Sequence, residues 1–188
     1  KKEGILKLLE SFSGLVVIDE AYIDFSKNES WLSELKTYPN LIVTQTLSKA
    51  YGLAGIRLGI CYASEEIIGV LNKIKPPYNV NNLTQNVALE TLDNYSEVET
   101  QVNQILNERS TLASALEQIS WVKKVYPSEA NFLLAKVDDA NQRYSQLLKK
   151  GIVIRNRTKE LLCENCLRLT VGTPSENKNL VNALTEIE

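Results

Sequence analysis

Histidine is absent from this sequence of 188 residues. Catalytic triads that need an imidazole, and metal sites built on histidine, are therefore excluded within the chain. Methionine is absent too, even at position 1, and we expect the chain to be a fragment of a longer protein. Only three cysteines are present. Such an odd, small number cannot form a closed disulfide framework and indicates a reducing compartment, the cytoplasm.

Long apolar runs and an excess of one charge are also lacking. The 21 lysines and arginines nearly balance the 23 aspartates and glutamates, which leaves a net charge of −2. Neither nucleic acid nor a membrane surface is therefore an expected partner. No apolar stretch approaches the roughly 20 residues of a transmembrane helix. The 44% hydrophobic and 23% charged residues are typical of a globular protein.

The first third of the sequence predicts an α/β sheet. Residues 15–18 and 41–44 are short β-branched runs, typical of strands buried on both faces. A short helix over 31–36 would connect them as a crossover, so the two strands should be parallel. The next run, 57–62, follows too short a loop for a crossover and is predicted to be antiparallel. Because ligands bind at the carboxyl edge of open parallel sheets, Asp19 and residues 46–49 should be neighbours there.

The rest of the sequence predicts three helices and then a second α/β unit. The helices are expected over 65–75, 83–92 and 96–119. The second unit has predicted strands near 122–125, 131–135, 153–155 and 167–171, a helix over 139–149, and a last helix that opens with a capping box at Thr173-Pro174-Ser175-Glu176. We place the domain boundary inside the long helix, which gives domains 1–111 and 112–188.

Five chemically distinct side chains should gather at the predicted sheet edge. They are the carboxylate of Asp19, the phenol of Tyr22, the hydroxyl of Ser48, the amine of Lys49 and the guanidinium of Arg57. Asp19 directly follows a predicted buried strand, where an ionised carboxylate needs a cationic partner. The set fits an aromatic cofactor that bears a phosphate and an aldehyde, because an amine captures the aldehyde and a guanidinium binds the phosphate.

Two sequence blocks carry a family resemblance. Residues 19–22 (DEAY) and 46–59 (TLSKAYGLAGIRLG) resemble the pyridoxal-phosphate segment of fold type I aminotransferases, and within them the subfamily that acts on histidinol phosphate. The likeness continues through 128–132 (SEANF) and 166–173 (CLRLTVGT). It implies an α/β fold in which 1–111 form the second half of the cofactor-binding large domain, a mostly parallel sheet with helices, and 112–188 form a smaller carboxyl-terminal α/β domain.

The resemblance also implies three catalytic roles. Lys49 would bind the cofactor aldehyde covalently and then shuttle a proton between the substrate and the cofactor. Asp19 would pair with the pyridine nitrogen and keep it protonated. Tyr22 would donate a hydrogen bond to the phenolic oxygen of the cofactor.

Five further residues match the family's binding positions. Thr46, Ser48 and Arg57 would hold the cofactor phosphate. Arg155 and Arg168 would receive the anionic end of the substrate. No metal site is expected.

The implied reaction is transamination between histidinol phosphate and 2-oxoglutarate, with glutamate as the other amino acid, in histidine biosynthesis. The resemblance further implies a cytoplasmic homodimer that acts on small molecules. The amino-terminal half of the family pattern is lacking from this chain. We therefore expect the isolated chain neither to transaminate nor to bind the cofactor tightly.

Other interpretations stay open at this point. The parent could be another class I or II aminotransferase, an amino-acid-phosphate decarboxylase or a non-catalytic, aminotransferase-like regulatory domain. Asp19-Glu20 would also suit the acidic strand end of a P-loop ATPase, which needs a glycine-rich lysine loop that this sequence lacks. Cys163 and Cys166 have metal-like spacing, but without histidine only Cys61 could join them. We interpret this pair as an inert loop and strand start.

Overall fold

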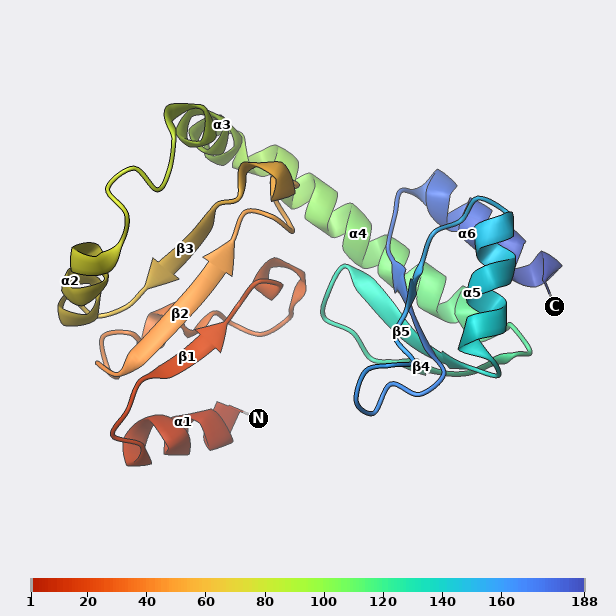
Figure 1. The fold of residues 1–188 in the computed structure, drawn as a ribbon, viewed down its shortest axis with the longest axis horizontal. Helices are drawn as coiled ribbons and strands as arrows, with labels where there is room; N and C mark the ends of the chain where they lie inside the picture. The colour runs from red at the N-terminus through yellow and green to blue at the C-terminus, as the bar shows by residue number, and fades with distance from the viewer. Residues whose placement is uncertain (1, 188) are drawn as a thin grey trace. The chain divides into compact units, whose positions relative to one another are not determined.

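A computed structural model describes residues 2–187 as a mixed α/β protein with two sheets and six α-helices (Figure 1). The chain divides into two compact units between Val98 and Glu99. Both residues belong to helix α4 (Tyr95–Leu116). The boundary predicted from the sequence, between residues 111 and 112, falls further along the same helix and stays a prediction.

The sheet of the first unit has the predicted topology. Its strands are β1 (Val16–Asp19), β2 (Leu41–Thr46) and β3 (Gly59–Tyr62), in the order β1-β2-β3. β1 and β2 pair in parallel, and β2 and β3 pair antiparallel, which confirms both predictions. The crossover contains a 3-10 helix, η2 (Trp31–Glu34), rather than an α-helix.

One face of this sheet is closed by helix α1 (Lys2–Ser11) and by η2. The apolar cluster there consists of Leu9, Val16, Leu41 and Val43, with Ile5, Ile18, Trp31, Leu32, Leu35, Tyr38 and Tyr62 packed against it.

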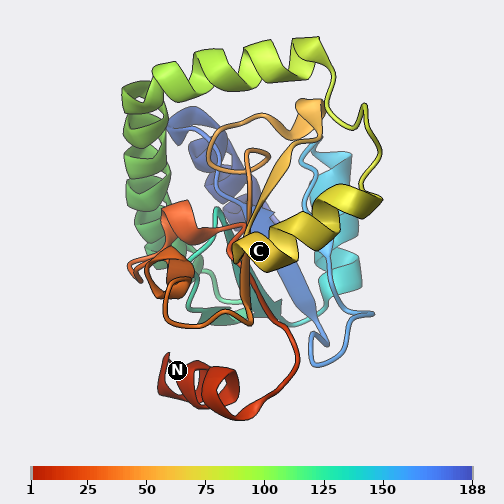
Figure 2. The ribbon, with the colours of Figure 1, turned by 90° about the vertical axis from the view of Figure 1, so that its left-hand side faces the viewer.

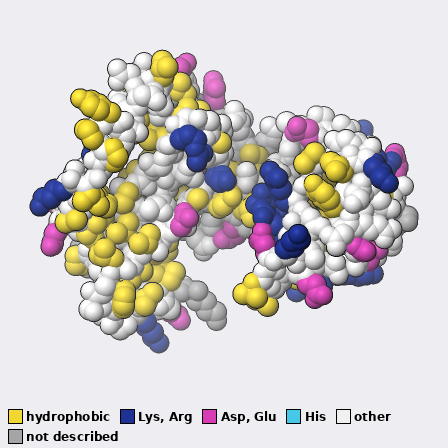
Figure 3. Space-filling model, in the orientation of Figure 1, with side chains coloured by type: hydrophobic (Ala, Val, Ile, Leu, Met, Phe, Trp, Pro, Cys, Tyr) yellow, Lys and Arg dark blue, Asp and Glu magenta, His cyan; other side chains and the backbone are white. Residues whose placement is uncertain are grey.

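The other face of β1 is open, so the prediction that residues 15–18 are buried on both faces is wrong. Val17 is 60% exposed and Asp19 is exposed. The cause is the alternation of the strand, which directs these two side chains away from α1 and η2. Exposed hydrophobic side chains are numerous on the first unit (Figure 3).

Two helices follow β3, and both begin where the sequence predicts. In α2 (Glu65–Ile74), the Ser64 hydroxyl caps the first turn. In α3 (Asn82–Asp93), the Asn81 side chain accepts a hydrogen bond from the Thr84 N–H at 2.9 Å. A single residue, Asn94, then separates α3 from α4 (Figure 2). Within the described residues, no helix has the length and apolar character required to cross a membrane.

The second unit is an antiparallel sheet with one face packed against helices. Its strands are β4 (Val122–Tyr126), β5 (Phe132–Val137), β6 (Arg155–Asn156) and β7 (Cys166–Thr170), in the order β4-β5-β7-β6. Alternate residues of β5 and β7 face the core. This core also contains residues of α4, α5 (Ala140–Lys149) and α6 (Pro174–Glu186).

The predicted capping box of α6 is confirmed. The Thr173 hydroxyl accepts a hydrogen bond from the Glu176 N–H, and the Thr173 N–H donates to the Glu176 carboxylate at 2.8 Å. The hydrogen bonds that the carboxylate accepts from the Thr173 N–H and from the Thr173 hydroxyl lower the pKa of Glu176.

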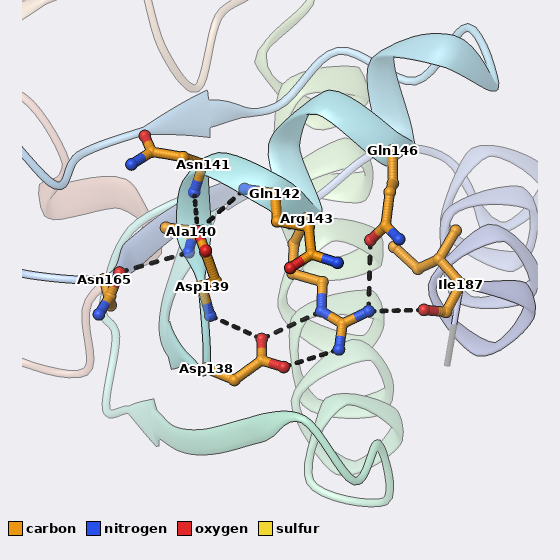
Figure 4. Close-up of polar contacts among 9 residues, drawn as sticks. All are labelled: Asp138, Asp139, Ala140, Asn141, Gln142, Arg143, Gln146, Asn165 and Ile187. Atoms are coloured by element: carbon orange, nitrogen blue, oxygen red, sulfur yellow. Dashed lines mark hydrogen bonds and ion pairs between the residues drawn. The ribbon is translucent and has the colours of Figure 1, made fainter.

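Arg143 joins three parts of the second unit (Figure 4). Its guanidinium donates two hydrogen bonds to the carboxylate of Asp138, at 3.0 and 2.6 Å, and one to the Ile187 carbonyl at 2.6 Å. A fourth bond reaches Gln146 at 3.2 Å. The guanidinium carbon also lies 4.7 Å from the centroid of the Trp121 ring. One side chain therefore ties the end of β5 to α5 and to the end of α6.

We expect Arg143→Ala to lower the free energy of unfolding of the second unit by about 2–3 kcal/mol, because charged hydrogen bonds are lost and Asp138 loses its partner. Urea unfolding near neutral pH measures this. Lys150→Ala is the matched control, since its exposed ion pair with Glu186 also links α5 to α6 and should contribute less than about 1 kcal/mol. Equal losses of unfolding free energy in Arg143→Ala and Lys150→Ala would show that Arg143 has no special role in the stability of the second unit.

The ion pair between Arg143 and Asp138 also predicts that the stability of the second unit depends on pH. The hydrogen bonds from Arg143 lower the pKa of Asp138 from its ordinary value of 3.8. Its contribution to stability is therefore complete above that ordinary value and is lost as the pH falls through the lowered pKa of the folded state. In Arg143→Ala this acid-dependent loss should largely disappear.

Candidate functional site

The loop between β2 and β3 carries three of the predicted site residues, Ser48, Lys49 and Arg57, and it is closed by its own backbone. The Leu47 N–H donates to the Leu58 carbonyl at 3.3 Å, and the Leu53 N–H donates to the Leu47 carbonyl at 3.0 Å. The Gly52 N–H donates to the Lys49 carbonyl at 3.1 Å. Gly52 has a φ of 67°, which favours glycine at this turn. Lys49 is thereby held just beyond the end of β2.

Thr46 fixes the start of this loop. Its hydroxyl accepts a hydrogen bond from the Ser48 N–H at 3.1 Å and donates to the Leu58 carbonyl at 3.4 Å. Thr46 lies opposite Gly59 in the sheet. The two hydroxyl residues that the sequence assigns to phosphate binding are therefore adjacent, at the same strand end.

Lys49 and Tyr22 meet although they follow different strands. The Lys49 ammonium nitrogen lies 5.2 Å from the centroid of the Tyr22 ring, within cation–π range. Tyr22 precedes the 3-10 helix η1 (Ile23–Phe25). Both side chains are partly buried. The parallel pairing of β1 with β2 brings these two predicted site residues together.

Asp19 is the last residue of β1 and lies opposite Thr44 of β2. Its carboxylate accepts a hydrogen bond from the Ala21 N–H at 3.0 Å. The residue is exposed, so the expectation that its carboxylate needs a cationic partner because of burial is wrong. The cause is the open face of β1. On this face the Asp19 carboxylate shares a side with Thr44 and, two residues later, Thr46.

Arg57 ends the loop in a left-handed conformation, with a φ of 56°. Its guanidinium donates a hydrogen bond to the Ala54 carbonyl at 2.9 Å. A positive φ is strained for a residue with a side chain, and such strain is often found at functional sites. Arg57 is exposed, and the closure of the loop at Leu47 and Leu58 places it at the same end of the sheet as Lys49.

The second unit brings together the two predicted substrate arginines. Arg155 and Arg168 lie directly opposite each other in β6 and β7, so both side chains project from one face. The Arg168 guanidinium lies 5.0 Å from the centroid of the Phe132 ring. Its Nε is buried without a hydrogen-bond partner. Two adjacent cations, one with an unsatisfied N–H, form a suitable receptor for an anion.

Sequence reasoning assigned no role to Phe132, and to Glu20 only a place in the alternative P-loop interpretation. Glu20 is buried and hydrogen-bonded beneath the site, and Phe132 stacks under Arg168. Both could have been found from alternation. Because side chains alternate along a strand, Glu20 must point to the opposite face from Asp19. Phe132 begins β5, which pairs with β7, the strand that carries Arg168.

The cysteines do not form a recognisable metal site. All three are free thiols. Cys163 lies in a loop and Cys166 begins β7, as the sequence predicts, and Cys166 is buried. Across residues 2–187 there is no group of three or more metal-binding side chains from His, Cys, Asp and Glu.

The donors of the first unit fit an aromatic aldehyde cofactor with a phosphate. An amine lies beside a phenol, a carboxylate ends the neighbouring strand, and one hydroxyl residue ends and another follows the strand that leads to the amine. Such groups would supply a covalent anchor, a partner for a ring nitrogen and phosphate ligands. Asp19, Tyr22, Thr46, Ser48, Lys49 and Arg57 are the residues that could hold it.

Comparisons with known proteins agree with this chemistry. The family model for class I and II aminotransferases matches residues 1–184. A histidinol-phosphate aminotransferase of Flavobacterium johnsoniae is 63% identical over 182 residues, which are 97% of this chain and 52% of that protein. The chain thus spans about half the length of the curated relatives it matches.

Solved structures show the same fold. The histidinol-phosphate aminotransferase of Clostridium acetobutylicum superposes with a TM-score of 0.91 at 27% identity, covering 98% of this chain and 57% of that one. The Sinorhizobium meliloti enzyme of the same name, solved in complex with pyridoxal-5'-phosphate, superposes with a TM-score of 0.87 at 24% identity and covers 98% of this chain and 52% of its own.

Proposed function

This chain belongs to the class I and II aminotransferase family, and we propose that the whole protein moves an amino group between glutamate and the oxo form of histidinol phosphate in histidine biosynthesis, with 2-oxoglutarate as the other oxo acid. The observation that carries the proposal is the meeting of the Lys49 amine with the Tyr22 ring at the ends of two parallel strands. The 63% identity to a histidinol-phosphate aminotransferase supports this choice of substrate.

The proposed cofactor is pyridoxal phosphate. When bound, it supplies an aldehyde and a protonated ring that withdraws electrons from the reacting carbon. Lys49 provides the amine that anchors it, and the same nitrogen later carries a proton. Asp19, whose carboxylate is exposed at the end of β1, would pair with the ring nitrogen and keep it protonated. Tyr22 donates its phenolic proton to orient the cofactor beside Lys49.

The cofactor phosphate would be held at the two ends of the β2–β3 loop. Thr46 and Ser48 contribute hydroxyls where the loop begins, and Arg57 contributes a guanidinium where it ends. Hydrogen bonds from a cation to a phosphate are stronger than those between neutral groups. Because backbone hydrogen bonds already hold the loop closed, less conformational entropy is lost when the phosphate binds.

Arg155 and Arg168 would bind the anionic end of the substrate, the phosphate of histidinol phosphate or the carboxylate of 2-oxoglutarate. This role is supported by the direct cross-strand pairing of Arg155 with Arg168. It is also supported by the Nε of Arg168, which is buried without a hydrogen-bond partner. One receptor for both anions would allow the two substrates to react in turn.

The whole protein is proposed to be a cytoplasmic homodimer. Free thiols agree with a reducing compartment. Large exposed apolar side chains such as Ile74 (74%) and Leu83 (78%) agree with contacts to further protein surface.

The proposed function is tested by assaying the purified whole protein with pyridoxal phosphate, histidinol phosphate and 2-oxoglutarate. Glutamate should form, and Arg168→Gln should raise KM for histidinol phosphate about 10- to 100-fold, because a charged hydrogen bond is lost. Histidinol without its phosphate should react poorly with the unaltered protein. A preference for aromatic amino acids, or release of carbon dioxide without amino transfer, would overturn the proposed reaction.

A further inference from the structure

Glu20 directly follows Asp19, and its carboxylate is buried, with 6% of the residue exposed. It accepts three hydrogen bonds: from the Trp31 N–H at 2.6 Å, from the Ser30 hydroxyl at 2.7 Å and from the Gln45 amide at 2.9 Å. Burial of a carboxylate is costly unless its oxygens are satisfied in this way. The three bonds therefore define one arrangement of the surrounding segments.

The three donors come from two separate parts of the first unit. Gln45 belongs to β2 and immediately precedes Thr46. Ser30 and Trp31 begin η2, and the Ser30 hydroxyl also accepts the Leu32 N–H at 3.1 Å as the cap of that helix. The Glu20 carboxylate thus connects the end of β1 both to β2 and to the start of η2.

This tie lies between two residues of the proposed cofactor site. Asp19 comes one residue before Glu20, and Tyr22 comes two residues after it. The Glu20 N–H donates to the Thr44 carbonyl at 2.8 Å, and the Glu20 carbonyl accepts the Ile23 N–H at 3.1 Å. Backbone and side chain together therefore fix the course of residues 19–22.

On the basis of the proposed function, we propose that Glu20 is a positioning residue: its buried carboxylate holds residues 19–22 so that Asp19 and Tyr22 serve the Lys49 site. Glu20 itself lies on the closed face of the sheet and acts through these neighbours. Glu20→Gln keeps the size of the side chain but replaces one acceptor oxygen with a donor, which cannot accept from Ser30 or Gln45.

A double-mutant cycle in the whole protein tests this role. With Asp19 intact, Glu20→Gln should lower kcat about tenfold and change KM for histidinol phosphate less than about threefold, as for a lost transition-state interaction. In an Asp19→Asn background the same change should lower kcat less than about twofold, because the residue it acts through is already altered. Equal losses in both backgrounds, or no loss in either, would overturn the proposal.

Hydrogen exchange of the cofactor-free whole protein gives a readout that is independent of activity. Glu20→Gln should speed exchange of the Trp31 amide and of the amides of η1 about tenfold, and it should leave the paired amides of β2 unchanged. Glu29→Gln is the matched control, because Glu29 is exposed in the same connection; its exchange and kcat should equal those of the unaltered protein. Unchanged exchange in Glu20→Gln would refute the tie.

Ser30→Ala covers the case in which Glu20→Gln does not fold. It removes one of the three donors to Glu20 together with the cap on the Leu32 N–H, and it should lower kcat about threefold with Asp19 intact, and not at all in the Asp19→Asn background. The opposite pattern would overturn the proposal. If the unaltered protein neither transaminates nor forms a covalent adduct at Lys49, the proposed function fails instead, and the exchange experiment still decides whether Glu20 fixes residues 19–22.

Discussion

Lys49→Ala should abolish covalent attachment of pyridoxal phosphate and lower kcat roughly 1,000-fold, because one change removes both the anchoring amine and the proton carrier. Borohydride reduction of the loaded whole protein, followed by peptide mass spectrometry, measures the attachment. The unaltered protein should carry the added mass on the peptide that contains Lys49. The fold should be retained, since Lys49 is partly exposed and the loop is closed by the backbone hydrogen bonds from Leu47 to Leu58 and from Leu53 to Leu47.

Lys36→Ala is the matched control, because Lys36 is an exposed lysine of the same unit. It should leave attachment and kcat unchanged. Attachment that survives Lys49→Ala, or labelling of Lys36 and Lys49 to the same extent, would show that Lys49 is an ordinary surface amine.

Asp19→Asn should lower kcat about 100-fold with a much smaller change in KM, because an amide cannot hold the ring nitrogen in its protonated form. The absorbance band of the bound cofactor should also shift, which reports the ring directly. Steady-state kinetics and the spectrum of the loaded whole protein measure both effects. Asp19 is exposed, so the substitution should change stability little.

Asp93→Asn provides the comparison for this substitution, since Asp93 is an exposed aspartate at the end of α3. Its kcat and spectrum should match those of the unaltered protein. An Asp19→Asn protein with a raised KM and a normal kcat would show that Asp19 binds substrate and does not act on the cofactor.

Local signals predicted most of the fold. The capping box at Thr173, the cap at Ser64 and the β-branched runs that became β1 and β2 each depend on neighbours close in sequence. The short loop before β3 was enough to fix its antiparallel direction. These features are encoded within a few residues, and so the sequence alone identifies them.

Burial was harder to predict than secondary structure. Val17 belongs to an apolar run and is nevertheless exposed, because which face of a strand is covered depends on elements elsewhere in the chain. The strand expected over 153–155 forms only at Arg155 and Asn156, since pairing at a sheet edge is set by the partner strand β7.

The candidate site also has one part that the sequence predicts and one part that only the structure shows. The meeting of Lys49 with Tyr22 follows from parallel pairing, which the sequence predicts. The role of Glu20 depends on Ser30 and Gln45, which approach it only in the folded chain. A buried polar contact between distant residues leaves no periodic pattern, so it becomes visible only in the structure.

The alignment of Arg155 with Arg168 is set by backbone pairing and not by the loop between them. Insertions or deletions at residues 158–164 should therefore accumulate during evolution without altering the spacing of the two guanidinium groups. A slip of β6 by a single residue is a different matter. It would set Asn156 against Arg168 and turn Arg155 to the other face of the sheet, so that no choice of rotamer could restore the paired charge.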